Sequence, residues 1–236
     1  MRGIIVGTGS IGTRHINNLV ALGVDVEAIS YRANKTLIKR YKNANVKINT
    51  LQEKINFSKF DFVVVANETH LHMKTAITAL KNGCHVFIEK PLSVDRRGIN
   101  ELKKLSQEKN KIVKVGFMLR YHPNLKYIKK FIEKNQIGKI LYIRATVGQN
   151  LSKWRINYDF KKGYSINKKK GGGVIFDLCH EFDYLSWFLG KFNNIYALNQ
   201  KIGFISDNVE SISHIIFTTI NNISGTITLD YVKPFW

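Results

Sequence analysis

Three glycines near the start of the chain have the spacing that a phosphate-binding turn requires. They lie in Gly7-Thr8-Gly9-Ser10-Ile11-Gly12, between an apolar run and an amphipathic segment. That pattern indicates a strand, a turn and a helix, in which Gly9 leaves room for a pyrophosphate and Gly12 lets the helix pack closely on the strand. The first N–H groups of the helix favour an anion. We therefore predict a dinucleotide site in preference to a purely structural turn.

The end of the second predicted strand distinguishes the two nicotinamide dinucleotides. In this arrangement an acidic side chain binds the ribose 2′-hydroxyl, whereas a nearby arginine suits a 2′-phosphate. Arg32 and Lys35 follow the strand expected at 24–30, while Asp25 and Glu27 lie too early in it. These residues favour NADP as the cofactor and leave NAD as the alternative. A solvated basic turn would contain the same residues.

Polar residues follow two continuous apolar runs, which are typical of buried parallel strands. The candidates are Asn67, Thr69 and His70 after the run 62–66, and Glu89 and Lys90 after the run 85–88. Because ligands bind outside the carboxyl ends of such strands, we expect these side chains at the nicotinamide half of the cofactor. Capping of the following helix is an equal alternative for His70. Pro91 restricts the backbone after Lys90 and places Lys90 at the mouth of the crevice.

The order of apolar patterns predicts two domains. Strands and helices alternate through residue 120, with helices near 11–22, 69–81 and 95–109 and a last strand near 112–119. This alternation predicts an α/β fold, a Rossmann domain over 1–120. Beyond it, helices near 124–134 and 173–189 accompany strands near 139–147, 195–198, 211–220 and 223–231. Successive strands predict an α+β domain over 121–236 with a mostly antiparallel, open sheet.

The net charge of +20 raises the question of a nucleic-acid partner. Residues 1–118 hold 20 basic and 9 acidic side chains, and residues 119–236 hold 17 and 8. Because this excess is spread evenly and not clustered with aromatic residues, we predict no nucleic-acid partner. The sequence contains neither an apolar run that would cross a bilayer nor an export signal, so a cytoplasmic protein without a membrane partner is expected.

The two cysteines do not suggest a metal centre. Cys84 and Cys179 are far apart in sequence, and each lies in an apolar context. Their spacing matches neither a metal cluster nor a disulfide framework, so we expect reduced thiols and no bound metal.

In order and spacing, the motifs resemble the Gfo/Idh/MocA oxidoreductases, NAD(P)-dependent enzymes that act largely on sugars, polyols and their derivatives. The matching stretches are 7–15, 63–72, 89–92 and the glycines 171–173 leading into Asp177, His180 and Asp183. The segments 119–123, 147–149, 154–155 and 180–184 are similar to a bacterial subgroup associated with surface-glycan or nonulosonic-acid sugar biosynthesis. The resemblance implies hydride transfer between a nicotinamide cofactor and a hydroxyl or keto carbon of a sugar or amino-sugar derivative.

The resemblance also implies catalytic roles for three residues. Lys90 would contact both the nicotinamide ribose and a substrate hydroxyl, and His180 would be the acid/base. In most of the family an aspartate lies four residues before this histidine, but that position is Phe176 here and Asp177 lies three before. Since both spacings share one face of a continuous helix, Asp177 is expected to serve instead. A histidine, with an unperturbed pKa of about 6.5, can accept a hydroxyl proton at neutral pH.

Other side chains are suited to bind a sugar. Aromatic rings stack on apolar C–H faces, and arginine binds carboxylate or phosphate with two parallel hydrogen bonds. The substrate candidates are Arg120, Trp154, Arg155, Tyr164, Asp183 and Tyr184. The rings between 149 and 170 could instead only anchor a long loop. On one helix over 173–189, Asp177, His180, Glu181 and Tyr184 would form a single polar stripe, for which a solvated face is the alternative.

The second domain is expected to be incomplete. Members of the resembled family usually continue for several dozen residues past the position of Trp236, so a truncated or partial protein is expected. Family members commonly associate through this sheet, and an uncovered face with an unpaired edge favours a partner. We therefore expect a homo-oligomer. The alternative to an enzyme is a non-catalytic dinucleotide-binding sensor or partner subunit.

Overall fold

The computed structural model describes residues 1–31, 38–39, 41, 46–50, 55–154 and 159–234. The chain forms two compact units, Met1–Gly116 and Phe117–Trp236. Each unit has its own sheet and its own buried apolar clusters. Among the described residues, no helix is both long enough and apolar enough to span a membrane.

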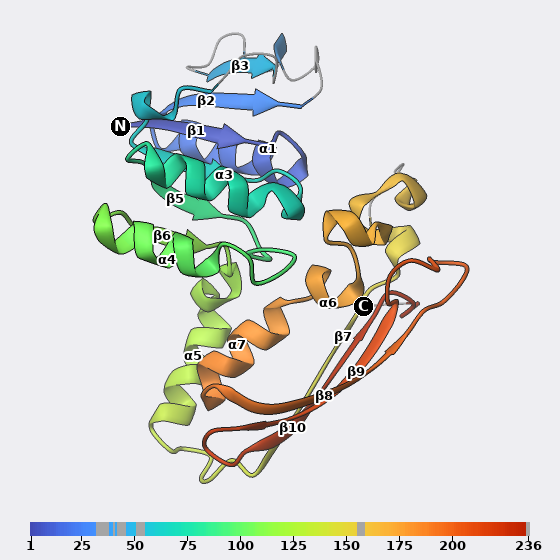
Figure 1. Cartoon of the computed structure of the whole chain (residues 1–236). Helices are drawn as coiled ribbons and strands as arrows, with labels where there is room; N and C mark the ends of the chain where they lie inside the picture. The colour runs from blue at the N-terminus through green and yellow to red at the C-terminus, as the bar shows by residue number, and fades with distance from the viewer. Residues whose placement is uncertain (32–37, 40, 42–45, 51–54, 155–158, 235–236) are drawn as a thin grey trace. The chain divides into compact units, whose positions relative to one another are not determined.

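The described part of the first unit is built on a parallel sheet of six strands in the order β3-β2-β1-β4-β5-β6 (Figure 1). The strands are β1 (Arg2–Val6), β2 (Asp25–Ser30), β3 (Val46–Thr50), β4 (Phe62–Val65), β5 (His85–Ile88) and β6 (Val113–Val115). The strand order reverses direction between β1 and β4, which is where such folds bind ligands at the carboxyl ends of their strands. The predicted α/β Rossmann fold is confirmed.

Helices pack on both faces of this sheet because its central strands are apolar on both sides. The helices are α1 (Ser10–Ala21), α3 (Thr69–Lys81) and α4 (Ile99–Glu108). Ile4 and Ile5 are both buried and, as neighbours in a strand, face opposite sides. Ile5 shares a cluster with Ile16 of α1, whereas Ile4 shares one with Leu80 of α3 and Leu102 of α4.

Two elements of the first unit are shorter than predicted. The helix expected at 95–109 begins only at Ile99, because Gly98 adopts a left-handed conformation (φ 79°) and Asp95 accepts the Arg97 N–H in a separate turn. The strand expected at 112–119 ends at Val115. Pairing with β5 ends where the Gly116 N–H donates to Ile88, and the chain then enters the 3₁₀ helix η2 (Met118–Tyr121).

The described part of the second unit contains a four-stranded sheet in the order β7-β10-β9-β8 (Figure 1). The elements are α5 (Pro123–Glu133), β7 (Tyr142–Gly148), α7 (His180–Leu189), β8 (Phe192–Gln200), β9 (Ile212–Thr219) and β10 (Ser224–Asp230). Strands β8, β9 and β10 pair antiparallel, and β7 joins β10 in parallel. Buried residues alternate with exposed or half-buried ones along β9 and with half-buried ones along β10. One face of these strands therefore packs in the core that includes α7, and the other face carries the more exposed side chains.

The single helix predicted over 173–189 is wrong. The structure has a short helix α6 (Val174–Asp177) and then α7, with a turn at Leu178 and Cys179 between them. Leu178 leaves the helical conformation (φ −103°, ψ 36°). A distant residue binds the start of α6: Glu210 accepts the N–H groups of Val174 and Ile175. The argument that Asp177 shares one continuous helix face with His180 therefore fails.

Candidate active site

The glycine turn after β1 has the shape that a dinucleotide requires. Gly7 adopts φ 105°, and a Cβ there would overlap the backbone of Ala66 and Asn67. A Cβ on Gly12 would overlap the carbonyl oxygen of Gly7, so only glycine lets α1 approach the turn. By contrast, no atom lies within 4 Å of the Cβ position of Gly9. The turn therefore combines two enforced close approaches with open space at Gly9, where a pyrophosphate would need it.

The end of β2 bears a hydroxyl. Ser30 is buried there, and its Oγ accepts a hydrogen bond of 2.8 Å from the Thr8 Oγ1 of the glycine turn. Glu27, earlier in the strand, binds Arg2 and accepts from Asn49 at 3.1 Å. Arg32 and Lys35, on which the preference for NADP depends, lie outside the described residues.

The three candidates after β4 have different surroundings. The amide nitrogen of Asn67 donates to the Tyr31 hydroxyl and to Thr75 Oγ1, each at 3.0 Å. Its Oδ1 is buried and has no hydrogen-bond partner among the described residues. Thr69 is buried at the first position of α3. His70 is exposed, and its Nδ1 lies 3.7 Å from a carboxylate oxygen of Glu68. The side-chain nitrogen of Asn67 is thus fixed by two hydrogen bonds, while its Oδ1 accepts none from the described residues.

The carboxylate of Glu89 is held within the protein. Its Oε1 lies 2.6 Å from His15 Nε2 of α1, and its Oε2 accepts the Lys90 N–H at 3.2 Å. The His15 ring also contacts Phe87 edge to face, with centroids 5.3 Å apart. Glu89 therefore links the helix of the glycine turn to the backbone of Lys90. This geometry is that of a residue that supports the backbone after β5, while direct cofactor contact by Glu89 stays a prediction.

Sequence reasoning gave no role to His72, which is 1% exposed. Its Nδ1 lies 2.9 Å from the carbonyl oxygen of Pro91, and its Nε2 lies 3.0 Å from that of Asn67. The available signal was helical spacing, because His72 follows Thr69 by three positions and precedes Ala76 by four, on the buried face of α3.

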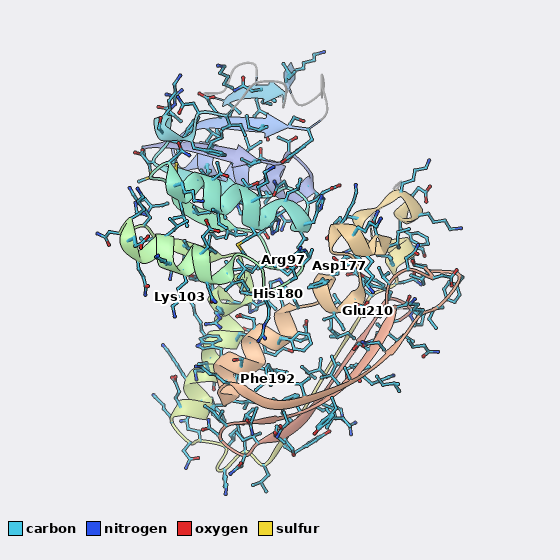
Figure 2. All side chains as sticks on the ribbon, viewed as in Figure 1. Arg97, Lys103, Asp177, His180, Phe192 and Glu210 are labelled. Carbon is cyan, nitrogen blue, oxygen red and sulfur yellow. The ribbon has the colours of Figure 1, made fainter. Side chains whose placement is uncertain are left out.

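In the second unit, His180 is the first residue of α7 and is partly exposed. Its ring contacts Phe117 edge to face, with centroids 5.9 Å apart. Asp177 is buried at the end of α6, and its Oδ2 accepts a 2.6 Å hydrogen bond from the hydroxyl of Tyr231, which is itself fully buried. Figure 2 shows Asp177 and His180 on the two adjoining helices. Burial and the neighbouring Asp177 raise the pKa of Tyr231 well above its usual value, so Tyr231 remains a donor.

Two predicted substrate residues bind each other. Arg120 donates from Nε and Nη2 to the two carboxylate oxygens of Asp183, each at 2.8 Å. The hydrogen bond to Asp183 raises the pKa of the Arg120 guanidinium, although burial opposes it. The guanidinium also lies 5.8 Å from the centre of the Trp187 ring. An anionic substrate would have to compete with Asp183 for Arg120.

The remaining substrate candidates are spread over the unit. The Trp154 ring packs on the apolar core, 6.1 Å from the Tyr231 ring. Tyr164 begins a 3₁₀ helix, and its carbonyl oxygen lies so close to Gly172 that a Cβ at that glycine would overlap it. Arg155 lies outside the described residues.

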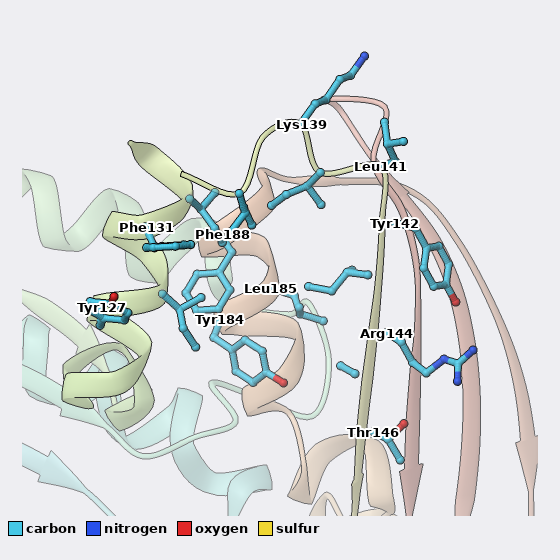
Figure 3. A pocket seen from close by; sticks show the side chains of 16 residues that line it. Tyr127, Phe131, Lys139, Leu141, Tyr142, Arg144, Thr146, Tyr184, Leu185 and Phe188 are labelled. Atoms are coloured by element: carbon cyan, nitrogen blue, oxygen red, sulfur yellow. The ribbon is translucent and has the colours of Figure 1, made fainter. Parts of the chain in front are cut away.

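Tyr184 lines an open, mostly apolar pocket of about 930 Å³ that is lined by residues of α5, α7 and the strand β7 (Figure 3). Its ring centroid is 5.6 Å from that of Phe188. Burial, aided by the charge of Glu181, raises the pKa of Tyr184 to about 12. The pocket lining includes none of the other predicted substrate residues. Tyr184 therefore lies in an apolar pocket that neither Arg120 nor His180 lines.

Comparison with known proteins agrees with this arrangement. A family model described as an oxidoreductase family with an NAD-binding Rossmann fold matches residues 1–117, and the GFO/IDH/MocA C-terminal domain matches residues 125–235. Myo-inositol 2-dehydrogenase of Thermotoga maritima is 27% identical over 81% of this chain and 55% of its own length. Inositol 2-dehydrogenase/D-chiro-inositol 3-dehydrogenase of Shouchella clausii is 28% identical over 84% and 56%. The chain thus spans about half the length of the curated relatives it matches.

Solved structures show the same fold. Myo-inositol 2-dehydrogenase of Lactobacillus plantarum superposes with a TM-score of 0.83 at 25% identity, over 98% of this chain and 69% of that one. The WlbA dehydrogenase of Bordetella pertussis, solved with NADH and UDP-GlcNAcA, gives a TM-score of 0.83 at 20% identity over 99% and 68%. The resemblance seen in the sequence is confirmed in both units: the chain belongs to the Gfo/Idh/MocA family of oxidoreductases.

Proposed function

We propose that this chain is an NAD(P)-dependent oxidoreductase that transfers a hydride between the nicotinamide and a hydroxyl or keto carbon of a sugar or amino-sugar derivative. The observation that carries the proposal is the glycine turn after β1, where Gly7 and Gly12 are enforced and Gly9 is open. The relatives named as inositol dehydrogenases support a polyhydroxylated substrate. The cofactor supplies or accepts the hydride, and residues of the chain must handle the proton and the charge.

In this proposal His180 accepts the hydroxyl proton when the alcohol is oxidised and returns it in the reverse direction. Lys90 is proposed to donate to the reacting oxygen of the substrate and to stabilise the negative charge that develops on it. Asp177 is the carboxylate proposed to orient His180, because both oxygens of Asp183 already bind Arg120. The Tyr231 hydroxyl would hold Asp177 in place. The paired Arg120 and Asp183, with Trp154 and Tyr164, are proposed to line the sugar site.

The direct test is turnover. The purified chain is incubated with NADH, NADPH or their oxidised forms and a panel of inositols, sugars and amino-sugar derivatives, and absorbance at the reduced nicotinamide band is followed. Oxidation or reduction that depends on one substrate class would support the enzyme. Cofactor binding without turnover of any member of the panel would favour a dinucleotide-binding sensor or partner subunit.

We propose NADP(H) as the preferred cofactor, with NAD(H) as the alternative. Support comes from Ser30 at the end of β2 and from Arg32 and Lys35 after it, since a hydroxyl and two cations suit a 2′-phosphate. Arg32→Asp is expected to weaken NADPH binding far more than NADH binding, as measured by fluorescence titration. Arg97→Asp, on an exposed turn, serves as the matched control. Tighter binding of NADH than NADPH by the unchanged chain would contradict the preference.

We also propose a homo-oligomer formed through the open face of the second sheet. Tyr196 and Ile216 lie directly opposite each other on β8 and β9, and both are exposed. Leu198, two residues along β8, adds a third exposed apolar side chain to that face. Light scattering at micromolar concentration is expected to give at least twice the mass of one chain, and Ile216→Glu is expected to lower it. A well-folded monomer before substitution would reject the proposal.

A further inference from the structure

The ring of His72 lies between two loops that follow neighbouring strands. Its Nδ1 is 2.9 Å from the Pro91 carbonyl oxygen, after β5, and its Nε2 is 3.0 Å from the Asn67 carbonyl oxygen, after β4. The side chain is 1% exposed. Both contacts are short enough to be hydrogen bonds, and neither is open to water that could replace it.

Both neighbours of the ring can only accept a hydrogen bond. A neutral imidazole has one N–H to donate, whereas the imidazolium has two. Burial lowers the pKa of His72, while the two carbonyl groups and the charge of Glu89 act in the opposite direction and the nearby His70 lowers it further. In either protonation state at least one carbonyl group receives a buried hydrogen bond from this ring, and loss of the ring would leave that carbonyl unsatisfied.

The loop after β5, which contains Lys90 and Pro91, has further contacts besides the one with His72. The Glu89 carboxylate accepts the Lys90 N–H and binds His15 of α1. The backbone of Lys90 is therefore flanked by the Glu89 carboxylate before it and by the Pro91 carbonyl group after it. Across the ring, the carbonyl group of Asn67 belongs to the residue whose buried Oδ1 has no partner among the described residues.

We propose that His72 is a positioning residue. It holds the loop after β5, which contains Lys90 and Pro91 (the Lys90 loop), against the loop after β4, which contains Asn67 (the Asn67 loop), before a nicotinamide cofactor binds. The proposal rests on the proposed function, because it assigns a purpose to the fixed spacing of these two loops. A pre-organised site binds its ligand without ordering these loops first, so affinity falls when the spacing is released. A histidine that only fills the core would contribute to stability and leave the Lys90 loop unchanged.

The experiment compares His72→Leu with His72→Gln, which keeps an amide donor for one carbonyl group. His85→Leu is the matched control, since His85 Nδ1 accepts the Ile112 N–H at the opposite end of β5. Three quantities are measured: hydrogen exchange of the Lys90 amide in the ligand-free chain by NMR, the dissociation constants for NADH and NADPH by fluorescence titration, and the thermal midpoint.

Loss of one hydrogen bond of ordinary net strength corresponds to about tenfold in an equilibrium constant. His72→Leu is expected to speed Lys90 amide exchange and to weaken binding of the preferred cofactor by about that factor. His72→Gln is expected to recover part of both effects. His85→Leu is expected to lower the thermal midpoint while exchange of the Lys90 amide and cofactor affinity stay within about twofold.

The outcomes separate this proposal from the proposed function. Unchanged Lys90 exchange in folded His72→Leu would overturn the positioning role, as would an equal effect of His85→Leu. If the unchanged chain binds neither NADH nor NADPH, the proposed function fails, and the exchange measurement still decides whether His72 holds the loop. If His72→Leu does not fold, His72→Gln carries the comparison, and normal exchange in that variant together with normal affinity would count against the proposal.

Discussion

Replacing His180 with asparagine is expected to lower kcat by about 10² to 10⁴, the usual contribution of a positioned proton-transfer group. Asparagine keeps a similar size and a hydrogen-bonding side chain but cannot accept the proton at neutral pH. The affinity for NADPH or NADH is expected to stay nearly unchanged, because His180 is not among the residues proposed to bind the cofactor. Steady-state kinetics on the substrate class found by the turnover screen, together with fluorescence titration, checks both parts.

His214→Asn is the matched control for this variant. His214 is exposed on β9, where its Nδ1 lies 3.4 Å from Thr228 Oγ1. Its replacement is expected to leave kcat within about twofold, as for most surface changes. If His180→Asn retained more than about half of the activity, His180 would not be the acid/base. The aromatic contact with Phe117 would then remain as a structural role of its ring.

Lys90→Met is expected to lower kcat/KM by at least about 100-fold, because the lysine is proposed to hold both the nicotinamide ribose and the reacting oxygen. Methionine keeps an unbranched apolar stem of similar length and removes the charge and the N–H donors. Cofactor affinity is expected to fall as well, which distinguishes this variant from His180→Asn. Both quantities come from the same kinetic and fluorescence measurements.

The control for the charge itself is Lys103→Met, on the exposed side of α4 (Figure 2). In a chain of net charge +20, loss of one exposed cation is expected to change long-range attraction of an anionic cofactor only slightly. An equal loss of affinity in Lys103→Met and Lys90→Met would assign the effect to general charge. A Lys90→Met variant with kcat/KM within twofold of the unchanged chain would remove Lys90 from the proposed mechanism.

The glycine turn and the parallel sheet of the first unit could be predicted because their signals are local. A turn between a strand and a helix depends on residues within a few positions of each other. The spacing of Gly7 and Gly12 is therefore enough to predict the turn. A buried parallel strand requires an uninterrupted apolar run, as in β4 and β5. The carboxyl ends of those strands then place Asn67 and Lys90 at one edge of the sheet by topology.

The break between α6 and α7 had no local signal. Neither Leu178 nor Cys179 is a glycine or proline, and the apolar periodicity continues through both. The turn is associated with contacts from far along the chain: Tyr231 binds Asp177 across 54 positions, and Glu210 binds Ile175 across 35. Apolar periodicity indicates which face of a helix would be buried. It contains no information about which distant side chains bind the ends of that helix.

By itself, the sequence determined the kinds of chemistry available: the glycine turn, the strands that Asn67 and Lys90 follow, and His180 downstream of three consecutive glycines. Tertiary structure alone decided the partners. Arg120 and Asp183 form an ion pair across 63 positions, and His72 became the link between two loops. The physical reason is that hydrogen-bonding capacity is a property of a residue type, whereas its use depends on which donors and acceptors folding brings within about 3 Å.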